Sequence, residues 1–203
     1  MKKLLPTYGI MIFGILGVIA SFYYPGGSQA DPTSEGFSWA HNYWCNLLYT
    51  WAINGESNSA QPVAIAATLV LFASLAYFFY QFPKYFSINK IWDRLIRFTG
   101  VGAMVLAVLV FSHLHDLFGI ICSVMGLVTL VGIFYGVVKH RQRVFAVVAV
   151  WCILLVGMNN YIYFSENYIH YLPIVQKITF ASVLLWVIGI NIQFLKLGRK
   201  PVT

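Results

Sequence analysis

The chain has 203 residues, of which 60% are hydrophobic and only 9% are charged, and its formal net charge at pH 7 is +7. Soluble domains carry roughly 25% charged residues, so this composition excludes an ordinary water-soluble protein. The positive charge does not indicate nucleic-acid binding, because the basic residues are spread over four short segments rather than gathered in one patch.

Apolar stretches of membrane-spanning length recur along the chain. A helix needs about 20 mostly apolar residues to cross a hydrocarbon core of about 30 Å. The sequence therefore predicts an all-α, polytopic membrane protein, in which a bundle of six transmembrane helices forms a single domain. The predicted spans cover residues 5–23, 62–82, 98–115, 117–138, 144–163 and 173–195.

The outer loop at residues 25–61 is the longest connection between predicted spans. Its second half carries large apolar side chains at helical spacing and ends near Gly55, a residue suited to terminate a helix. These side chains are Trp39, Tyr43, Trp44, Leu47, Leu48 and Trp51. Because Trp and Tyr favour the membrane–water interface, we expect residues 38–54 to form an aromatic helix lying in the outer interface.

The middle of the chain, residues 98–138, is a nearly unbroken apolar run about twice as long as one crossing requires. Basic residues flank both ends of this run, so both ends belong on the same side of the membrane. The chain must therefore turn back midway, at His113-Leu-His-Asp116. We expect a tight helical hairpin whose tip lies at the opposite membrane face.

The distribution of charge predicts the orientation of the spans. Twelve of the thirteen Lys and Arg residues fall on one side of the predicted spans, and Lys177 is the exception. Five of the six acidic residues fall on the other side. The positive-inside rule then places both termini in the cytoplasm of a multi-pass cell-membrane protein.

Unusual polar side chains gather at or above the predicted outer face. Ionisable groups within a membrane usually face the bundle interior or a wet cavity, so this grouping predicts an outward-facing polar pocket. The pocket would bind or sense a membrane lipid or another amphipathic ligand, with the aromatic helix as its lid. The candidate ligand-binding residues are His41, Asn42, Asn46, His113, Asn159, Asn160, Tyr163 and Lys177.

Simpler interpretations exist for two of these groups. Asn159 and Asn160 are also explained by hydrogen bonds between helices. Glu166 and Lys177 are also explained as an exposed ion pair that tethers the last outer loop, which would contribute little free energy.

The alternative function is an intramembrane metal-dependent hydrolase of a lipid amide or ester. On a continuing third helix, Ser112, His115 and Asp116 share one face. With histidines arriving from other segments, His41, His115 and His170 would hold Zn²⁺ while Asp116 orients the attacking water, whose pKa the metal lowers to about 7. Ser112 and Glu166 are the further candidate catalytic residues. The simpler interpretation is that Asp116 caps the fourth helix.

The pattern resembles two known families. The six spans, the segments Tyr24-Pro-Gly-Gly-Ser and Trp39-Ala-His-Asn-Tyr-Trp-Cys-Asn, and His113-Leu-His-Asp116 resemble the FRAG/DRAM/Sfk-type membrane family and its bacterial relatives. Members of that family are tied to lipid remodelling, lipid distribution and membrane trafficking, so the resemblance implies a lipid-related role.

A weaker likeness is to the alkaline-ceramidase and progestin-receptor-like superfamily of intramembrane zinc hydrolases. Those proteins combine a serine, an aspartate and three histidines, and Ser112, His115, Asp116 and His170 supply comparable residue types. One span and the paired histidine motif of the last helix are missing here. The likeness implies Zn²⁺ only under the hydrolase alternative.

Overall fold

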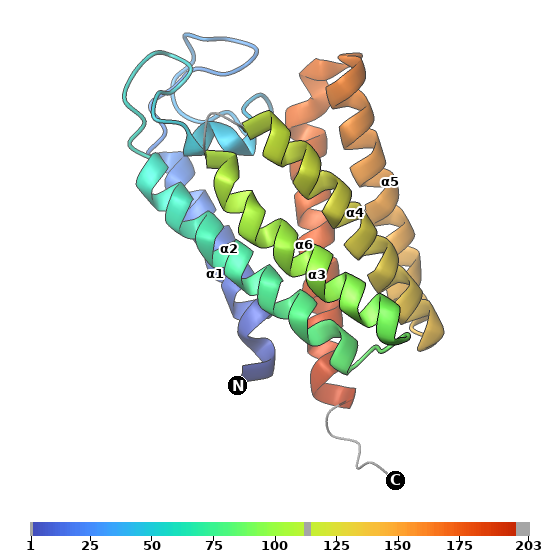
Figure 1. The fold of residues 1–203 in the computed structure, drawn as a ribbon. Coiled ribbons are helices and arrows are strands. Elements are labelled where there is room, and N and C mark those ends of the chain that lie inside the picture. Colours follow the sequence, from blue (N-terminus) through green and yellow to red (C-terminus); the bar gives the residue numbers. More distant parts are fainter. Residues whose placement is uncertain (1, 112–114, 198–203) are drawn as a thin grey trace. The chain divides into compact units, whose positions relative to one another are not determined.

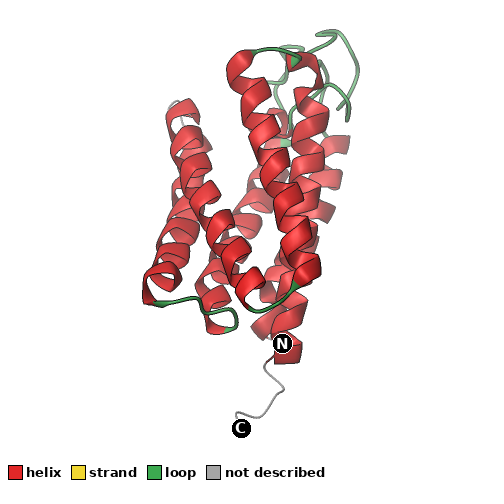
Figure 2. Cartoon of the chain, turned by 90° about the vertical axis from the view of Figure 1, so that its right-hand side faces the viewer, coloured by secondary structure: helices red, strands yellow, loops and turns green. Residues whose placement is uncertain are grey.

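The computed structural model describes residues 2–111 and 115–197. The chain is 77% helical, and the described residues contain no β-strand (Figure 2). This confirms the all-α prediction. The six α-helices of the described ranges are α1 (Leu5–Phe22), α2 (Gln61–Gln81), α3 (Lys90–Leu106), α4 (His115–Lys139), α5 (Arg143–Ser165) and α6 (Leu172–Leu197) (Figure 1).

Five of the described helices are long and apolar enough to cross a membrane. They are the helices of Leu5–Phe22, Gln61–Lys84, Leu117–Lys139, Arg143–Ser165 and Ile169–Leu197. Their number and composition support a membrane protein, as the hydropathy of the sequence predicts.

Helix α3 differs from the predicted third span, which begins at residue 98. The helix begins at Lys90, because the Asn89 side chain accepts hydrogen bonds from the backbone N–H groups of Ile91 and Trp92 at 3.0 and 2.9 Å. An asparagine in this position is a favoured helix N-cap. The first two turns therefore carry charged residues, and the helix continues beyond Leu106 as a 3-10 helix, Ala107–Phe111.

The chain divides into two compact units. The first consists of Met1–Ile10, Val70–Ile153 and Leu184–Thr203, and the second of Met11–Leu69 and Leu154–Val183. The first unit therefore contains all of α3 and α4, whereas the second contains the long connection between α1 and α2.

The core of the first unit is rich in phenylalanine. Four of its largest fully buried side chains are Phe78, Phe82, Phe86 and Phe194. The rings of Phe78 and Phe194 stack with centroids 5.6 Å apart, and those of Phe82 and Phe86 stack at 5.2 Å. The first pair joins α6 to α2, and Phe86 joins α6 to the short connection after α2, because its ring lies 6.1 Å from that of Phe194. Such aromatic pairs add stability beyond the area they bury.

Helices α3 and α4 pack against each other as an antiparallel hairpin. The paired residues are Trp92 with Tyr135, Ile96 with Gly132, and Thr99 with Thr129. Residue numbers rise along α3 as they fall along α4, which confirms that the apolar run folds back on itself. The predicted tip includes Ser112 and His113, which lie outside the described residues.

The expected aromatic helix over residues 38–54 is much shorter in the structure. Only Trp44–Leu48 is helical, as a five-residue 3-10 helix. Tyr43 and Tyr49 flank it in extended conformation, with ψ of 153° at both positions, so the helix cannot continue in either direction. Part of the apolar pattern in this segment packs against α1 without forming a long helix. The ring centroids of Trp44 and Phe13 lie 5.5 Å apart.

Close packing of α2 against α3 makes Gly100 a test of the first unit. A Cβ atom at Gly100 would lie 2.6 Å from the Cβ and Cγ atoms of Phe79. We expect Gly100→Ala to destabilise the protein, because an overpacking cost of about 1–3 kcal/mol exceeds the gain of about 1 kcal/mol from better helix propensity. The measurement is the midpoint of thermal unfolding in detergent.

Gly126→Ala is the matched control, because nothing lies within 4 Å of a Cβ atom at that position of α4. This variant should be as stable as the parent protein or more stable. Equal midpoints for the two variants would contradict the packing of Gly100 on Phe79.

Candidate functional site

The second unit contains a compact irregular segment, residues 23–60, here called the cap. Tyr24 and Leu47 are buried at its centre against Ala20, Ala60 and Ala64. The Tyr24 hydroxyl accepts a hydrogen bond of 3.1 Å from the backbone N–H of Ile53. Burial raises the pKa of Tyr24, so this phenol stays neutral and serves as a fixed internal support.

Asn42, a predicted ligand-binding residue, is fully buried within the cap. Its Oδ1 accepts from the backbone N–H of Ser38 and its Nδ2 donates to the carbonyl of Gly27, both at 2.8 Å. Both ends of the amide are therefore occupied by the cap itself. The side chain therefore joins the two halves of the cap.

Asn58 has a similar role that the sequence analysis missed. Its Nδ2 lies within hydrogen-bonding distance of three carbonyl oxygens, at 3.1 Å from Asn46, 3.3 Å from Leu47 and 2.8 Å from Tyr49. Its Oδ1 accepts from the backbone N–H of Ala60, the residue before α2. Asparagine often forms such a turn by accepting from the backbone two residues on, so this local bond was accessible from the sequence, whereas the three carbonyl contacts were not.

Lys177 connects α6 to the cap. Its ammonium group donates to the carbonyl oxygens of Asn42 and Pro173, and it lies 5.6 Å from the centroid of the Phe37 ring. The neighbouring Gln176 accepts a 2.9 Å hydrogen bond from the backbone N–H of Trp44. Lys177 thus fixes the cap through carbonyl oxygens and an aromatic face.

The predicted tether between Glu166 and Lys177 is replaced by these contacts. Glu166 is exposed and has a positive φ of 57° in the connection before α6. The ammonium group of Lys177 is directed instead to the carbonyl of Asn42 in the cap.

Asn46 is the predicted ligand-binding residue that keeps an unused polar atom. Its side chain is only 5% exposed, and its Oδ1 has no hydrogen-bond partner among the described residues. A buried acceptor without a partner is uncommon and indicates a place for a water molecule or a ligand group. The adjacent Cys45 thiol has its pKa raised by burial, so it is protonated and inert at neutral pH.

The other outer polar residues are dispersed. His41 is exposed, with its Nδ1 at 3.2 Å from the Ser38 hydroxyl, and His170 is exposed beside the Tyr171 ring. Asn160 donates a 2.8 Å hydrogen bond to the Val156 carbonyl of its own helix, rather than to another helix. Asn159 is half-buried, and Tyr163 is exposed at the end of α5.

The zinc hypothesis finds no support among the described residues. Among the described side chains, which leave out those of residues 110–116, no three His, Cys, Asp or Glu groups lie together so as to hold a metal ion. The side chains of His115 and Asp116 lie outside the described part, as do Ser112 and His113. The backbone places Asp116 in the first turn of α4, where a carboxylate is favoured by the helix dipole.

Comparisons with protein-family models, with curated proteins and with solved structures found no match for this chain. The geometry of the cap and the membrane-like helices therefore carries the functional inference.

Lys177→Met tests whether Lys177 is structural. The variant keeps the length of the side chain but leaves the Asn42 carbonyl without its donor, which costs about 1–3 kcal/mol. We expect a lower unfolding midpoint and faster proteolysis within residues 25–60. Lys196→Met removes the same charge from an exposed position of α6 and should change neither. A ligand-binding role alone would leave the stability of Lys177→Met unaltered.

The state of Cys45 predicts its reactivity. Burial raises its pKa, so at pH 8 the thiolate fraction is lower in the folded protein than in the unfolded chain. In a Cys122→Ala, Cys152→Ala background, we expect iodoacetamide to label Cys45 more slowly in the folded state than after denaturation. The measurement is the mass-spectrometric labelling rate, and equal rates in both states would contradict the buried position.

Proposed function

We propose that this chain is a six-span protein of the cell membrane, with both termini in the cytoplasm, which binds or senses a lipid or another amphipathic ligand at the outer membrane face. The observation that supports this most directly is the rigid cap with outward-facing aromatic side chains.

The sixth crossing would be made by α3 together with its 3-10 extension. At 1.5 Å per residue for the 17 residues of α3 and 2.0 Å for the five of Ala107–Phe111, the segment is about 36 Å long. That length suffices for a hydrocarbon core of about 30 Å. Arg94 and Arg97 lie in its first half, where long basic side chains reach the headgroup region.

The cap exposes two of its three tryptophans. Trp51 is 65% exposed and Trp39 is 45% exposed, although the backbone around them is held by buried amides. At the adjoining end of α1, Phe22 and Tyr23 are also exposed. Because Trp and Tyr favour the interface between headgroups and acyl chains, these side chains form a surface suited to lipid.

The hydrogen bonds of the cap make this surface preorganised. Ordering a flexible loop on binding costs free energy, whereas a fixed loop has lost that freedom on folding. The unpartnered Oδ1 of Asn46 offers an acceptor inside the same segment. It suits a ligand group that carries a hydroxyl or ammonium donor.

Fluorescence quenching in vesicles tests the proposal. The full chain is reconstituted in phosphatidylcholine vesicles that contain lipid brominated near the headgroup. We expect Trp39→Phe and Trp51→Phe each to lower the amount of tryptophan emission that the brominated lipid quenches, which is called the quenchable part of the emission. The reason is that these indoles contact lipid at the depth of the interface.

Trp186→Phe is the control, because Trp186 is only 2% exposed and its indole N–H donates to the Phe145 carbonyl. This variant should leave the quenchable part of the emission unchanged. An unchanged quenchable part in both Trp39→Phe and Trp51→Phe would show that the cap stands clear of lipid and would contradict the proposal.

A further inference from the structure

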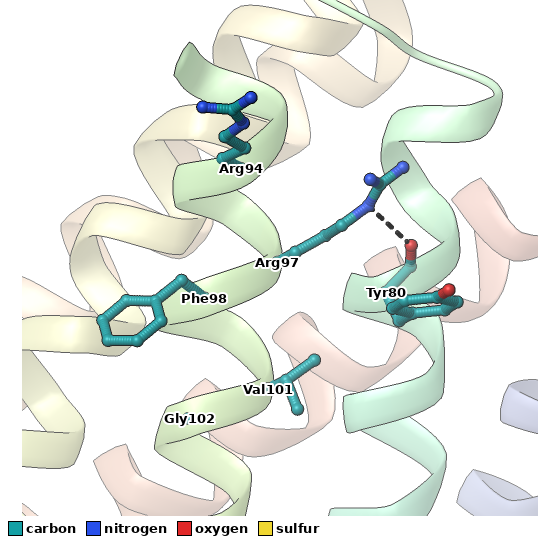
Figure 3. A pocket seen from close by; sticks show the side chains of 6 residues that line it. All are labelled: Tyr80, Arg94, Arg97, Phe98, Val101 and Gly102. Atoms are coloured by element: carbon teal, nitrogen blue, oxygen red, sulfur yellow. Dashed lines mark hydrogen bonds between the residues drawn. The ribbon is translucent and has the colours of Figure 1, made fainter. Parts of the chain in front are cut away.

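A shallow groove of about 480 Å³ lies between α2 and α3, within the first unit. Figure 3 shows the residues that line it, which are Tyr80 of α2 and Arg94, Arg97, Phe98, Val101 and Gly102 of α3. Along α3 the two arginines come first and the uncharged residues follow. The lining itself is almost entirely apolar, so the two arginines contribute their aliphatic stems to it and their guanidinium groups form a charged end beyond it.

The cationic end is held in place by Tyr80. Arg97 donates from Nε to the Tyr80 carbonyl oxygen at 3.2 Å, and its guanidinium carbon lies 5.6 Å from the Tyr80 ring centroid (Figure 3). Lys84 adds a second cation, with Nζ at 4.9 Å from the same centroid. Because the bond to Tyr80 uses only the Nε–H, the two terminal amino groups of Arg97 stay available to an anion.

Arg94 completes the charged end. It is exposed and lies one helical turn before Arg97, so both guanidinium groups serve the same end of the groove. Guanidinium groups bind phosphate oxygens through paired N–H donors, and this geometry makes arginine the preferred partner of planar or tetrahedral oxyanions.

The floor is suited to hydrocarbon. Phe98 is 75% exposed and Val101 is half-buried, while the space beside the Gly102 backbone is taken up by the end of the Met125 side chain of α4, 2.7 Å from where a Cβ atom would lie. A free phosphate ion would use the arginines alone and leave this apolar floor without a function. The ligand that satisfies both ends carries a phosphate group and a hydrocarbon chain.

We propose that this groove binds one anionic phospholipid, with its phosphate on Arg94 and Arg97 and one acyl chain along Phe98, Val101 and Gly102. A lipid with a net negative charge is favoured over a zwitterionic one, because the ammonium of a zwitterionic headgroup would meet Arg97 and Lys84. The groove belongs to the first unit and the cap to the second, so this proposal and the one for the cap fail or succeed separately.

The test is a titration of the detergent-solubilised full chain with fluorescently labelled dioctanoyl phosphatidylglycerol, followed by anisotropy. We expect the Arg94→Gln, Arg97→Gln double variant to bind about thirty-fold more weakly, since each basic side chain contributes roughly a factor of five. The same label on dioctanoyl phosphatidylcholine should bind the parent protein more weakly than the phosphatidylglycerol probe.

Two further variants separate the groove from general surface charge. Arg141→Gln, Arg143→Gln removes the same charge from the connection between α4 and α5 and from the first residue of α5. This place is near the segment before α3, because Lys139 at the end of α4 donates to the Ile88 carbonyl. This control should keep nearly full affinity. Val101→Phe retains both arginines but fills the floor, and we expect about five-fold or greater weakening.

Several outcomes would overturn the proposal. Equal losses of affinity in the two arginine double variants would show that the phosphatidylglycerol probe is attracted to any basic surface near the groove. Full affinity in Val101→Phe would show that no acyl chain occupies the floor, and equal affinity for the two probes would show that headgroup charge is not recognised. Because Val101→Phe keeps both charges, it tests the groove even if the arginine double variant fails to fold.

Discussion

The irregular backbone of the cap depends on side chains for its hydrogen bonds. Regular helices satisfy their own carbonyl and amide groups, but a loop at the end of a membrane-spanning bundle must find other partners. Here Asn42 and Asn58 supply six such bonds from within the cap, and Gln176 and Lys177 supply two from α6. The aromatic side chains of the cap can stay exposed because these interior amides hold the backbone.

The sequence could predict those features that follow from local rules. The fold-back of the middle apolar run follows from its length and flanking charges, and the pairing of Thr99 with Thr129 bears it out. Asn89 is a helix-start signal that could have placed the beginning of α3 at Lys90, but the third span was predicted from hydropathy alone and so began too late. The prediction of a helix over residues 38–54 was wrong because the same apolar spacing also suits a loop packed on a neighbouring helix.

The candidate sites show the same limit. Polar type and position marked Asn42 and Lys177 as unusual, but only the structure shows that their partners are backbone groups of the chain itself. Arg94 and Arg97 are among the basic residues from which the orientation of the spans is predicted. Phe98 lies four residues after Arg94 and Val101 four residues after Arg97, so the sequence already placed charged and apolar side chains on one face of a helix. The contact between Arg97 and Tyr80 of α2 could be seen only in the folded structure.

The hydroxyl contact between Thr99 and Thr129 has a consequence for how the chain is made. Each hydroxyl has one hydrogen, so one threonine donates to the other while the second donates to its own helix, and both are satisfied inside the hairpin. Under the six-span proposal, α3 is too polar at its start to partition into lipid by itself, whereas α4 is strongly apolar. Residues 90–139 would then leave the translocon together, with the later helix carrying the earlier one into the bilayer.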